Sequence, residues 1–249
     1  MNAEIFEETD YYFKQILKLI IYGYEQVKKD RKKKPYSRKE IYEIIKEVRE
    51  KEKVHFEIED YLRNDLVKQY LNDFKNDFEL STFLILSGSE EFKCNVKIGI
   101  VDIRFVSFSA TSLDNTGFIL ECKRLNKFSE MLKSYIEGGM MRFITKQYYA
   151  ESDVTLAGMI AFVEVDLVKH KDGFMPINEI AKQLKNTIDT YKNILNTTQE
   201  FLLYPLDDQK FGVISDFQYT YWTKHIRKDD CVEINIHHLL LDYHDILIS

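Results

Sequence analysis

Apolar residues recur at three- and four-residue steps along the first third of the chain, a spacing that predicts helices. Three helices are expected, over residues 5–29, from Ser37 to about Glu52, and over residues 58–78. Ser37 and Glu40 form the Ser-x-x-Glu capping pattern, which gives the second helix a defined start. The N-terminal part is therefore expected to be helical.

The pattern then changes to the alternation and short apolar runs of strands, interrupted by one helix. Strands are expected at residues 82–87, 96–108, 116–123 and 156–163, with a turn at 109–115 and a helix from Ser129 to about Tyr149. Residues 57–163 thus follow the order helix, three strands, helix, strand. Beyond them the pattern predicts a helix after Pro176 and strands near residues 212–221 and 231–241.

Length and composition indicate a folded protein with a sizeable core and without a disulfide framework. The 249 residues are 45% hydrophobic, enough for a sizeable core, and no apolar run approaches the ~20 residues of a membrane span. Cys94, Cys122 and Cys231 lie far apart, which argues against a disulfide framework and against a structural zinc site. The acidic N-terminus does not resemble a signal peptide, so we expect a cytoplasmic protein with no membrane partner.

We divide the chain into a helical N-terminal extension, residues 1–54, and a domain of residues 55–249 with an elaboration from about residue 170. The extension contains a basic run, residues 28–34, that is either a solvated linker or a phosphate contact. The net charge of −6 does not exclude nucleic acid, because docking depends on local charge.

The candidate chemistry lies on two of the expected strands. Residues two apart in a strand share a face, so Glu121 and Lys123 project together, about 6.6–7 Å apart at Cα. Phe118, Leu120 and Cys122 then fall on the opposite, buried face. Asp102 lies on the preceding strand, which a short connection makes an antiparallel neighbour.

Two carboxylates and a lysine in this arrangement suit a hard divalent cation. Mg²⁺ commonly takes one or two carboxylates, waters and substrate phosphate at about 2.0–2.1 Å. Asp102 and Glu121 are the expected metal ligands, and Lys123 would orient the attacking water or stabilise charge. This is the chemistry of phosphodiester hydrolysis.

The acid-x-Lys pattern alone is not specific in a chain that is 31% charged. It also occurs on a basic linker, a helix face and expected loops, at Asp30/Lys32, Asp73/Lys75, Glu91/Lys93 and Asp208/Lys210. None of these copies has an acid one hairpin upstream. The alternative interpretation of the copy at Glu121 is an exposed cross-strand ion pair, which contributes little to stability.

With Asp102, Glu121 and Lys123 in place, residues 57–163 resemble the PD-(D/E)xK nuclease superfamily, the restriction-endonuclease-like fold, in which Val101 replaces the usual proline. The resemblance implies an α/β protein with an αβββαβ core, a mixed central sheet flanked by helices. It also implies Mg²⁺-dependent cleavage, with Mn²⁺ as a substitute, of DNA or, less often, RNA. The products would carry 5′-phosphate and 3′-hydroxyl ends, and an endonuclease is favoured over an exonuclease.

Many members carry a further acid on the helix before the strands. A helical wheel places Glu59 near the middle of the inward face and Asp60 further round, so Glu59 is preferred, although both are ordinary helix-start acids as well. Arg63 also faces inward, where an acid on this helix or a phosphate would have to compensate its charge.

Other cations are candidate phosphate contacts. Arg142 and Lys146 share a helix side after Gly138 and Gly139, where close packing should compensate the two glycines. His225 and Arg227 share a strand face and are either phosphate contacts or a structural pair. Adjacent histidines in a strand point to opposite faces, so His237, His238 and His244 do not favour a zinc site. These segments also resemble nucleases of bacterial anti-phage systems.

The leading hypothesis is a metal-dependent nuclease acting on DNA as the effector of a bacterial defence system. The alternatives are a catalytically inactive nuclease-fold subunit that binds nucleic acid or a partner protein, and a purely structural interaction protein. We find no ATP-binding Gly-x-x-x-x-Gly-Lys-[Ser/Thr] loop and no helix-turn-helix in the sequence, so we expect a protein partner or a homo-oligomer to supply recognition and control.

Overall fold

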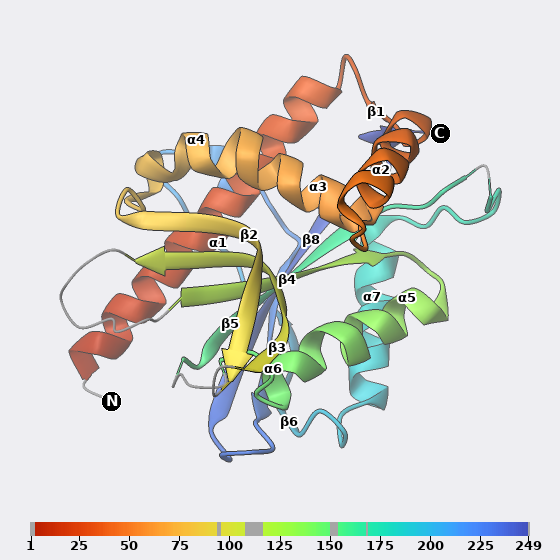
Figure 1. The fold of residues 1–249 in the computed structure, drawn as a ribbon. Helices are drawn as coiled ribbons and strands as arrows, with labels where there is room; N and C mark the ends of the chain where they lie inside the picture. Colours follow the sequence, from red (N-terminus) through yellow and green to blue (C-terminus); the bar gives the residue numbers. More distant parts are fainter. Residues whose placement is uncertain (1–2, 94–95, 108–116, 150–153, 168, 249) are drawn as a thin grey trace.

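The computed structural model describes residues 3–93, 96–107, 117–149, 154–167 and 169–248 (Figure 1). The predicted turn at 109–115 and Cys94 lie outside this part of the chain. No helix of the described residues is long and apolar enough to cross a membrane.

The centre of the molecule is a mixed seven-stranded sheet in the order β2-β3-β4-β5-β8-β7-β6. Neighbours β4, β5 and β8 run parallel, and the pairs towards both edges are antiparallel. The strands are β2 (Phe83–Lys93), β3 (Val96–Ser107), β4 (Gly117–Leu125), β5 (Leu156–Val163), β6 (Thr197–Leu203), β7 (Thr220–Ile226) and β8 (Glu233–Asp242). A separate parallel pair joins β1 (Tyr36–Ser37) to β9 (Leu247–Ile248).

Helices cover both faces of this sheet, which makes the protein α/β. They are α1 (Ala3–Arg31), α2 (Arg38–Glu52), α3 (Ile58–Leu66), the π-helical turn η1 (Val67–Leu71), α4 (Asn72–Phe74), the 3-10 turn η2 (Lys75–Phe78), α5 (Ser129–Tyr135), the π-helical turn η3 (Ile136–Met140), α6 (Met141–Ile144), α7 (Ile177–Thr190) and α8 (Gly212–Ser215). Helices α1 and α3 pack on one face, and α5 to α7 on the other.

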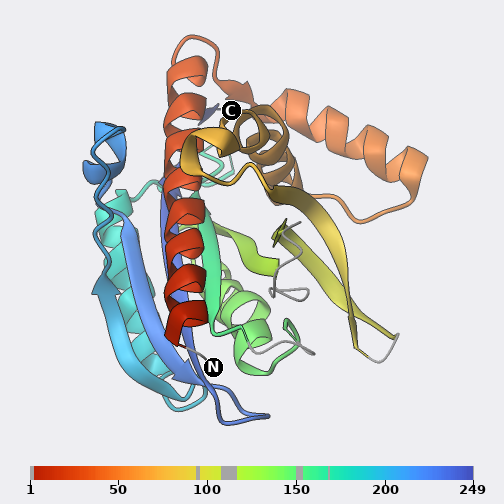
Figure 2. The ribbon, with the colours of Figure 1, turned by 90° about the vertical axis from the view of Figure 1, so that its left-hand side faces the viewer.

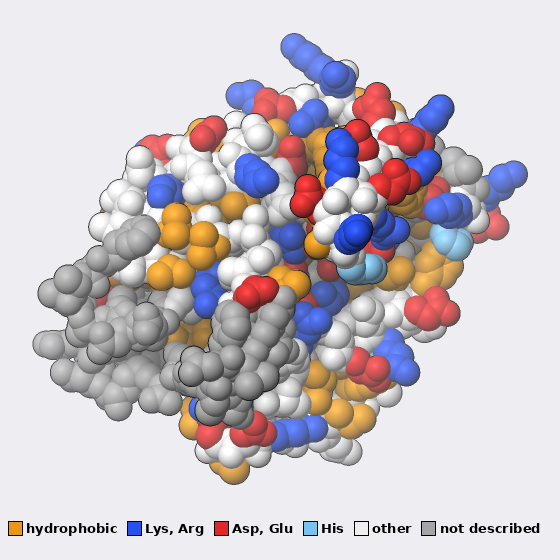
Figure 3. Space-filling view, viewed as in Figure 1, with side chains coloured by type: hydrophobic (Ala, Val, Ile, Leu, Met, Phe, Trp, Pro, Cys, Tyr) orange, Lys and Arg blue, Asp and Glu red, His pale blue; other side chains and the backbone are white. Residues whose placement is uncertain are grey.

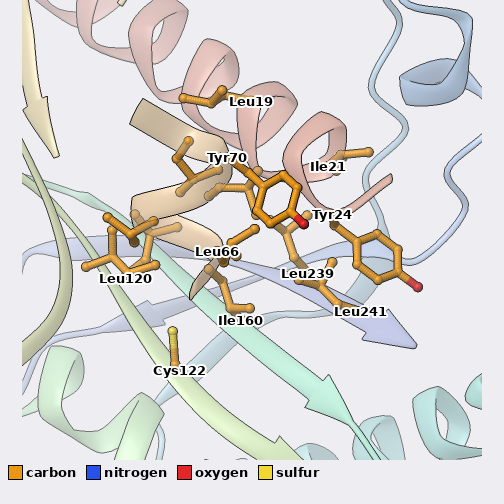
Figure 4. Close-up of a cluster of buried hydrophobic side chains, with 14 of the residues drawn as sticks. Leu19, Ile21, Tyr24, Leu66, Tyr70, Leu120, Cys122, Ile160, Leu239 and Leu241 are labelled. Atoms are coloured by element: carbon orange, nitrogen blue, oxygen red, sulfur yellow. The ribbon is translucent and has the colours of Figure 1, made fainter. Parts of the chain in front are cut away.

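Two hydrophobic clusters, one on each face, meet at β5, which is buried along its whole length. Ile160 and Phe162 belong to the cluster under α1, and Met159 and Ala161 to the cluster under α5 and α7. This is the burial expected of a parallel strand with helices on both faces. Figure 4 shows the first cluster, with side chains of α1 above those of β4, β5 and β8.

The first helix is part of this core. Helix α1 runs along the sheet (Figure 2), and its Phe13 ring lies 5.5 Å from the ring of Phe118 and 5.2 Å from that of His237. The predicted N-terminal extension, residues 1–54, therefore contributes α1 to the same core as the strands. Of the hydrophobic residues in α2, only Ile41 and Ile45 are buried.

Most expected elements are present, and the capping pattern of the second helix is confirmed. The Ser37 side chain accepts a hydrogen bond from the backbone N–H of Glu40 at 3.4 Å. The helix expected from Ser129 to Tyr149 ends earlier, at Ile144, because the chain then enters left-handed conformations, with φ of 52° at Lys146 and 60° at Tyr149.

Two expectations at the C-terminal end were wrong or incomplete. The strand predicted near 212–221 is instead the short helix α8, and the strand β7 begins only at Thr220. The edge strand β6 was not predicted, because its residues are mostly exposed and its sequence lacks a clear alternation. Glu91 and Lys93, expected in a loop, belong to β2.

Gly158 is required by close packing between neighbouring strands. It pairs with Leu120 of β4, and a Cβ atom added to Gly158 would lie 2.6 Å from Leu120 Cδ2 and 2.7 Å from Leu120 Cγ. Leu120 is fully buried and has little room to move.

We expect Gly158→Ala to lower the free energy of unfolding by about 1–3 kcal/mol, as overpacking in a core does. Gly212→Ala is the matched control, because nothing lies within 4 Å of a Cβ atom at that position. The control should change stability by no more than about 0.5 kcal/mol. Urea denaturation measures both, and equal midpoints for the two variants would show that Leu120 moves freely.

A chain of buried hydrogen bonds crosses the sheet on the α5 side. The Tyr135 hydroxyl lies 2.9 Å from His238 Nδ1, His238 Nε2 lies 2.9 Å from Thr223 Oγ1, and Thr223 Oγ1 lies 2.8 Å from His225 Nε2. Burial lowers the pKa of His225 to about 4 and holds that of His238 well below its usual value. Both imidazoles are therefore neutral in the folded protein at neutral pH.

These histidines should make the fold sensitive to acid. The unfolded chain takes up a proton on histidine near pH 6.5, and the folded protein does so on His225 only near pH 4. The free energy of unfolding should therefore fall between pH 6.5 and 4, by on the order of 3 kcal/mol for His225. We expect His225→Gln to reduce this slope in urea titrations across that range. His55→Gln, with 81% of the His55 side chain exposed, should leave it unchanged.

Candidate functional site

Strands β3 and β4 separate beside Asp102. Their ladder runs from Val106 opposite Gly117 to Ile103 opposite Leu120, and Asp102 follows directly. Beyond the end of the ladder, the Asp102 side chain bonds the backbone of β4: its Oδ2 accepts a hydrogen bond from the backbone N–H of Cys122 at 2.7 Å. The opening between the strands thus turns this carboxylate towards β4.

Glu121 projects from the same stretch of β4 and is fully buried. Its Oε1 accepts from Lys123 Nζ at 2.6 Å and from Arg142 Nη1 at 2.9 Å, and its Oε2 accepts from the Tyr148 hydroxyl at 2.6 Å. Burial, together with the nearby Asp102, raises the pKa of Glu121 to about 7, although Lys123 and Arg142 act in the opposite direction.

Lys123 lies between two carboxylates. Its Nζ is 2.6 Å from Glu121 Oε1 and 3.4 Å from Glu59 Oε1, and it donates to the Cys122 carbonyl at 2.9 Å. Burial alone would lower the pKa of Lys123, but the charges of Glu121, Glu59 and Asp102 outweigh it and raise that pKa. Lys123 is therefore a cation that can stabilise negative charge, and it is not a base in this state.

The N-terminal turn of α3 supplies Glu59. Glu59 Oε2 accepts from the backbone N–H of Arg124 at 2.8 Å, so its carboxylate faces β4. Asp60 instead accepts from the backbone N–H of Glu57 at 2.8 Å and caps the helix. Of the two acids considered from the sequence, the structure thus brings Glu59 to Lys123, and burial raises the pKa of Glu59.

Arg63 compensates two acids at once. Its Nη1 lies 2.8 Å from Asp60 Oδ1 and 2.6 Å from Asp102 Oδ1. The sequence indicated an acid on its own helix, and the contact with Asp102 is additional. The guanidinium also lies against β2 at Gly88, which has φ of 67° and where a Cβ atom would be 3.5 Å from Arg63 Nη2.

Arg142 and Tyr148 reach Glu121 from the irregular end of the α5 helix. Gly139 lies in the π-helical turn η3, and a Cβ atom there would lie 2.4 Å from Met159 Cε and 3.6 Å from Lys123 Cγ. This close approach explains why a helix tolerates that glycine. The Tyr148 hydroxyl also lies 2.7 Å from the Ile100 carbonyl oxygen, so its single proton is shared between Glu121 and β3.

Sequence reasoning missed Tyr148. It lies between two left-handed residues beyond the helix end, so no periodicity assigns it to a face. It also missed a buried network in which Glu164 bonds the side chains of Arg38 and Arg124. Since the backbone N–H of Arg124 also holds Glu59, this network fixes the end of β4 next to the site.

Among the residues that the structure describes, the cluster holds four acids and three cations, whose charges nearly balance. Glu59, Asp60, Asp102 and Glu121 face Arg63, Lys123 and Arg142. Close acid–base pairing of this kind is what buried charges require. On the molecular face in Figure 3, lysines and arginines are likewise interspersed with acids.

The chemistry of these donors fits a hard divalent cation, which binds carboxylate oxygens and needs only one or two of them beside water. Asp102 and Glu121 would hold such a cation, and Glu59 is joined to Glu121 through Lys123. Within the described part of the chain, no three His, Cys, Asp or Glu side chains converge closely enough to hold a metal ion. Any such site would therefore use two protein carboxylates or require their pairing with cations to change.

The structure does not bring the other proposed phosphate contacts to these carboxylates. Lys146 pairs with Asp230 at 2.9 Å. His225 on β7 and Arg227 directly after it are both buried, and β5 and β8 lie between β4 and β7. The Arg227 guanidinium donates to the carbonyl of Val154 instead.

The three C-terminal histidines are separated as the strand period predicts. His237 packs on the ring of Phe13, His238 bonds Tyr135 on the opposite face, and His244 bonds Asp242 at 2.7 Å.

An open pocket of about 930 Å³ lies away from the cluster, between the C-terminal half of α1 and the end of β8. Lys28, Lys29 and Lys32 of the basic run line it, together with the acids Glu25, Asp216, Asp242 and Asp245. None of the candidate catalytic residues does. The convergence of side chains, rather than this hollow, therefore defines the candidate site.

No family model, no curated protein and no solved structure matches this chain.

The buried pair of Arg63 and Asp102 should be important for stability. Arg63→Met removes the cation and leaves the Cys122 N–H as the remaining donor to buried Asp102 among the described residues, which should lower the free energy of unfolding by about 3–5 kcal/mol. Arg49→Met is the control, because Arg49 pairs with Glu57 with 44% and 42% of their side chains exposed. The control should cost at most about 1 kcal/mol. Similar losses in thermal or urea unfolding would argue against a special role for the Asp102 pair.

Proposed function

We propose that this protein is a metal-dependent nuclease that hydrolyses phosphodiester bonds in DNA. The observation that carries the proposal is the convergence of Asp102, Glu121, Lys123 and Glu59 from three separate elements. Glu121 and Lys123 of β4 thus lie close to Asp102 of β3. Glu59 of α3 joins them through its contact with Lys123. A surface ion pair does not account for this, because Glu121 is fully buried.

The order of elements supports a restriction-endonuclease-like core. From α3 to β5 the chain forms a helix, three strands, a helix and a strand. Strands β2, β3 and β4 are antiparallel neighbours, and β5 returns parallel to β4. The site residues lie where β3 and β4 separate, so the irregularity that opens the sheet also brings the two buried carboxylates near one another.

The roles of the side chains follow from their charges. A bound Mg²⁺ or Mn²⁺ would supply a water of lowered pKa and offset the charge that builds on the phosphate. Asp102 and Glu121 would hold the ion. Lys123, protonated between Glu121 and Glu59, would stabilise negative charge on the reacting phosphate. Glu59 positions Lys123 and keeps it from pairing with Glu121 alone.

One observation favours the alternative of a nuclease-fold subunit that binds nucleic acid or a protein without catalysis. Both Asp102 and Glu121 are already paired with internal cations, Arg63 and Arg142. A retired site could keep such pairs for stability. A defence setting and a protein partner or homo-oligomer stay predictions from the sequence.

A cleavage assay separates the two functions. Purified protein should cut plasmid or single-stranded DNA with Mg²⁺ or Mn²⁺ and not with EDTA. We expect Lys123→Ala and Asp102→Ala each to reduce the rate by at least about 100-fold, the scale for loss of one charge-stabilising group. Lys182→Ala removes a surface lysine that pairs with Glu179 and should cut like the wild type.

The same assay with RNA tests the preference for DNA. Absence of cutting on every substrate, with correctly folded protein, would favour the non-catalytic subunit. Equal activity of Lys123→Ala and the wild type would place any observed nuclease activity elsewhere.

A further inference from the structure

Arg142 is the most exposed of the groups that hold Glu121. Its side chain is 33% exposed, against 13% for Lys123, and Tyr148 is fully buried. Arg142 therefore reaches from the rim of the site to a carboxylate that has no contact with solvent of its own.

The oxygen that Arg142 occupies has no remaining capacity. A carboxylate oxygen accepts about two hydrogen bonds. Glu121 Oε1 already accepts from Lys123 at 2.6 Å and from Arg142 at 2.9 Å. A divalent cation that binds this oxygen must therefore displace one of the two donors.

Besides its bond to Glu121, the Lys123 side chain makes two further contacts within the described part of the chain, whereas the Arg142 side chain makes fewer. Lys123 also bonds Glu59 and the Cys122 carbonyl, so its departure would leave further buried acceptors unpaired. Apart from Glu121, the guanidinium of Arg142 bonds only the Tyr148 hydroxyl, at 2.5 Å, among the contacts of the described residues. The Tyr148 hydroxyl lies within hydrogen-bond distance of both Glu121 and the Ile100 carbonyl, so its proton still has an acceptor if Arg142 leaves.

The backbone around Arg142 is short and irregular. Helix α6 spans only Met141–Ile144, between the π-helical turn η3 and the left-handed Lys146. Arg142 can thus exchange its partner without disruption of the core, because its guanidinium lies at the rim.

We propose that Arg142 is an exchangeable counter-ion that competes with a divalent cation for Glu121 and is drawn away by a phosphodiester of the substrate. The inference rests on the proposed function. In the absence of nucleic acid, Arg142 neutralises Glu121 and weakens metal binding. A phosphate in the site accepts the guanidinium, whose fork of N–H donors can bond two phosphate oxygens at once, and so frees Glu121 Oε1. Metal and nucleic acid then bind cooperatively, which restrains the site until substrate is present.

Metal binding without nucleic acid tests the competition. Mn²⁺ affinity is measured by electron paramagnetic resonance of the free ion, with no turnover involved. Arg142→Ala should bind Mn²⁺ about 5- to 150-fold more tightly than the wild type, the range of coupling between linked sites. Lys133→Ala removes one positive charge from the neighbouring helix α5, where Lys133 pairs with Glu137, and should match the wild type. Thermal unfolding confirms that each variant is folded.

The outcomes distinguish the two proposals. If Arg142→Ala binds Mn²⁺ no more tightly than the wild type, while Glu121→Gln abolishes binding, the competition is wrong and the metal site stands. If Lys133→Ala tightens binding as much as Arg142→Ala, the effect is general electrostatics and the specific role of Arg142 is wrong. If neither the wild type nor Arg142→Ala binds Mn²⁺, the metal site of the proposed function fails, and the competition fails with it.

The exchange with phosphate has its own measurement. Because linkage is reciprocal, Ca²⁺ should tighten binding of a short fluorescent DNA duplex to the wild type by about fivefold or more at constant ionic strength. The Ca²⁺ effect should be retained in Lys133→Ala and lost in Arg142→Ala. A matching RNA duplex distinguishes the two nucleic acids. Duplex affinity that is independent of Ca²⁺ in the wild type, for both duplexes, would overturn the exchange.

Discussion

The burial of Glu121 is the constraint on which the site depends. A carboxylate without access to water is stable only when hydrogen bonds and opposite charges replace its hydration. Lys123 from its own strand, Arg142 from α6 and Tyr148 from the following segment together supply them. These contacts bring a strand, a short helix and a turn to one point, and the geometry of the site follows from their need to meet there.

The sheet provides the place where such a carboxylate can exist. Strand β4 pairs with β5 along its C-terminal half and with β3 along its N-terminal half, so Asp102 and Glu121 lie where β4 exchanges one neighbour for the other. The opposite face of β4 carries Phe118, Leu120 and Cys122 into the core under α1. The burial of that hydrophobic face stabilises the position of β4. This stabilisation allows the polar face to hold several charges close together while the protein stays folded.

The cations that neutralise the buried carboxylates contribute to stability, and they also occupy the groups that the proposed function requires. Arg63 and Arg142 neutralise the same carboxylates that a metal ion would use. A folded protein with these acids unpaired would be strained by repulsion among them, so the internal cations serve the fold first. Arg142, at the rim, can be exchanged for a metal ion while Lys123 and Tyr148 stay in place. The same residues can then meet the requirements of both stability and metal binding. The exposed position of Arg142 is what distinguishes it from its buried neighbours.

Local periodicity by itself determined much of this protein. A period of two placed Glu121 and Lys123 on one face and the apolar residues of β4 on the other, and a period near 3.6 placed Glu59 and Arg63 on the inward face of α3. The extended apolar run of β5 indicated a buried strand. Only the tertiary structure decided that α1 belongs to the core, that Arg63 reaches Asp102, and that Tyr148 holds Glu121. These contacts join residues far apart in the chain, and their formation depends on the angles at which whole elements pack, which no short-range pattern encodes.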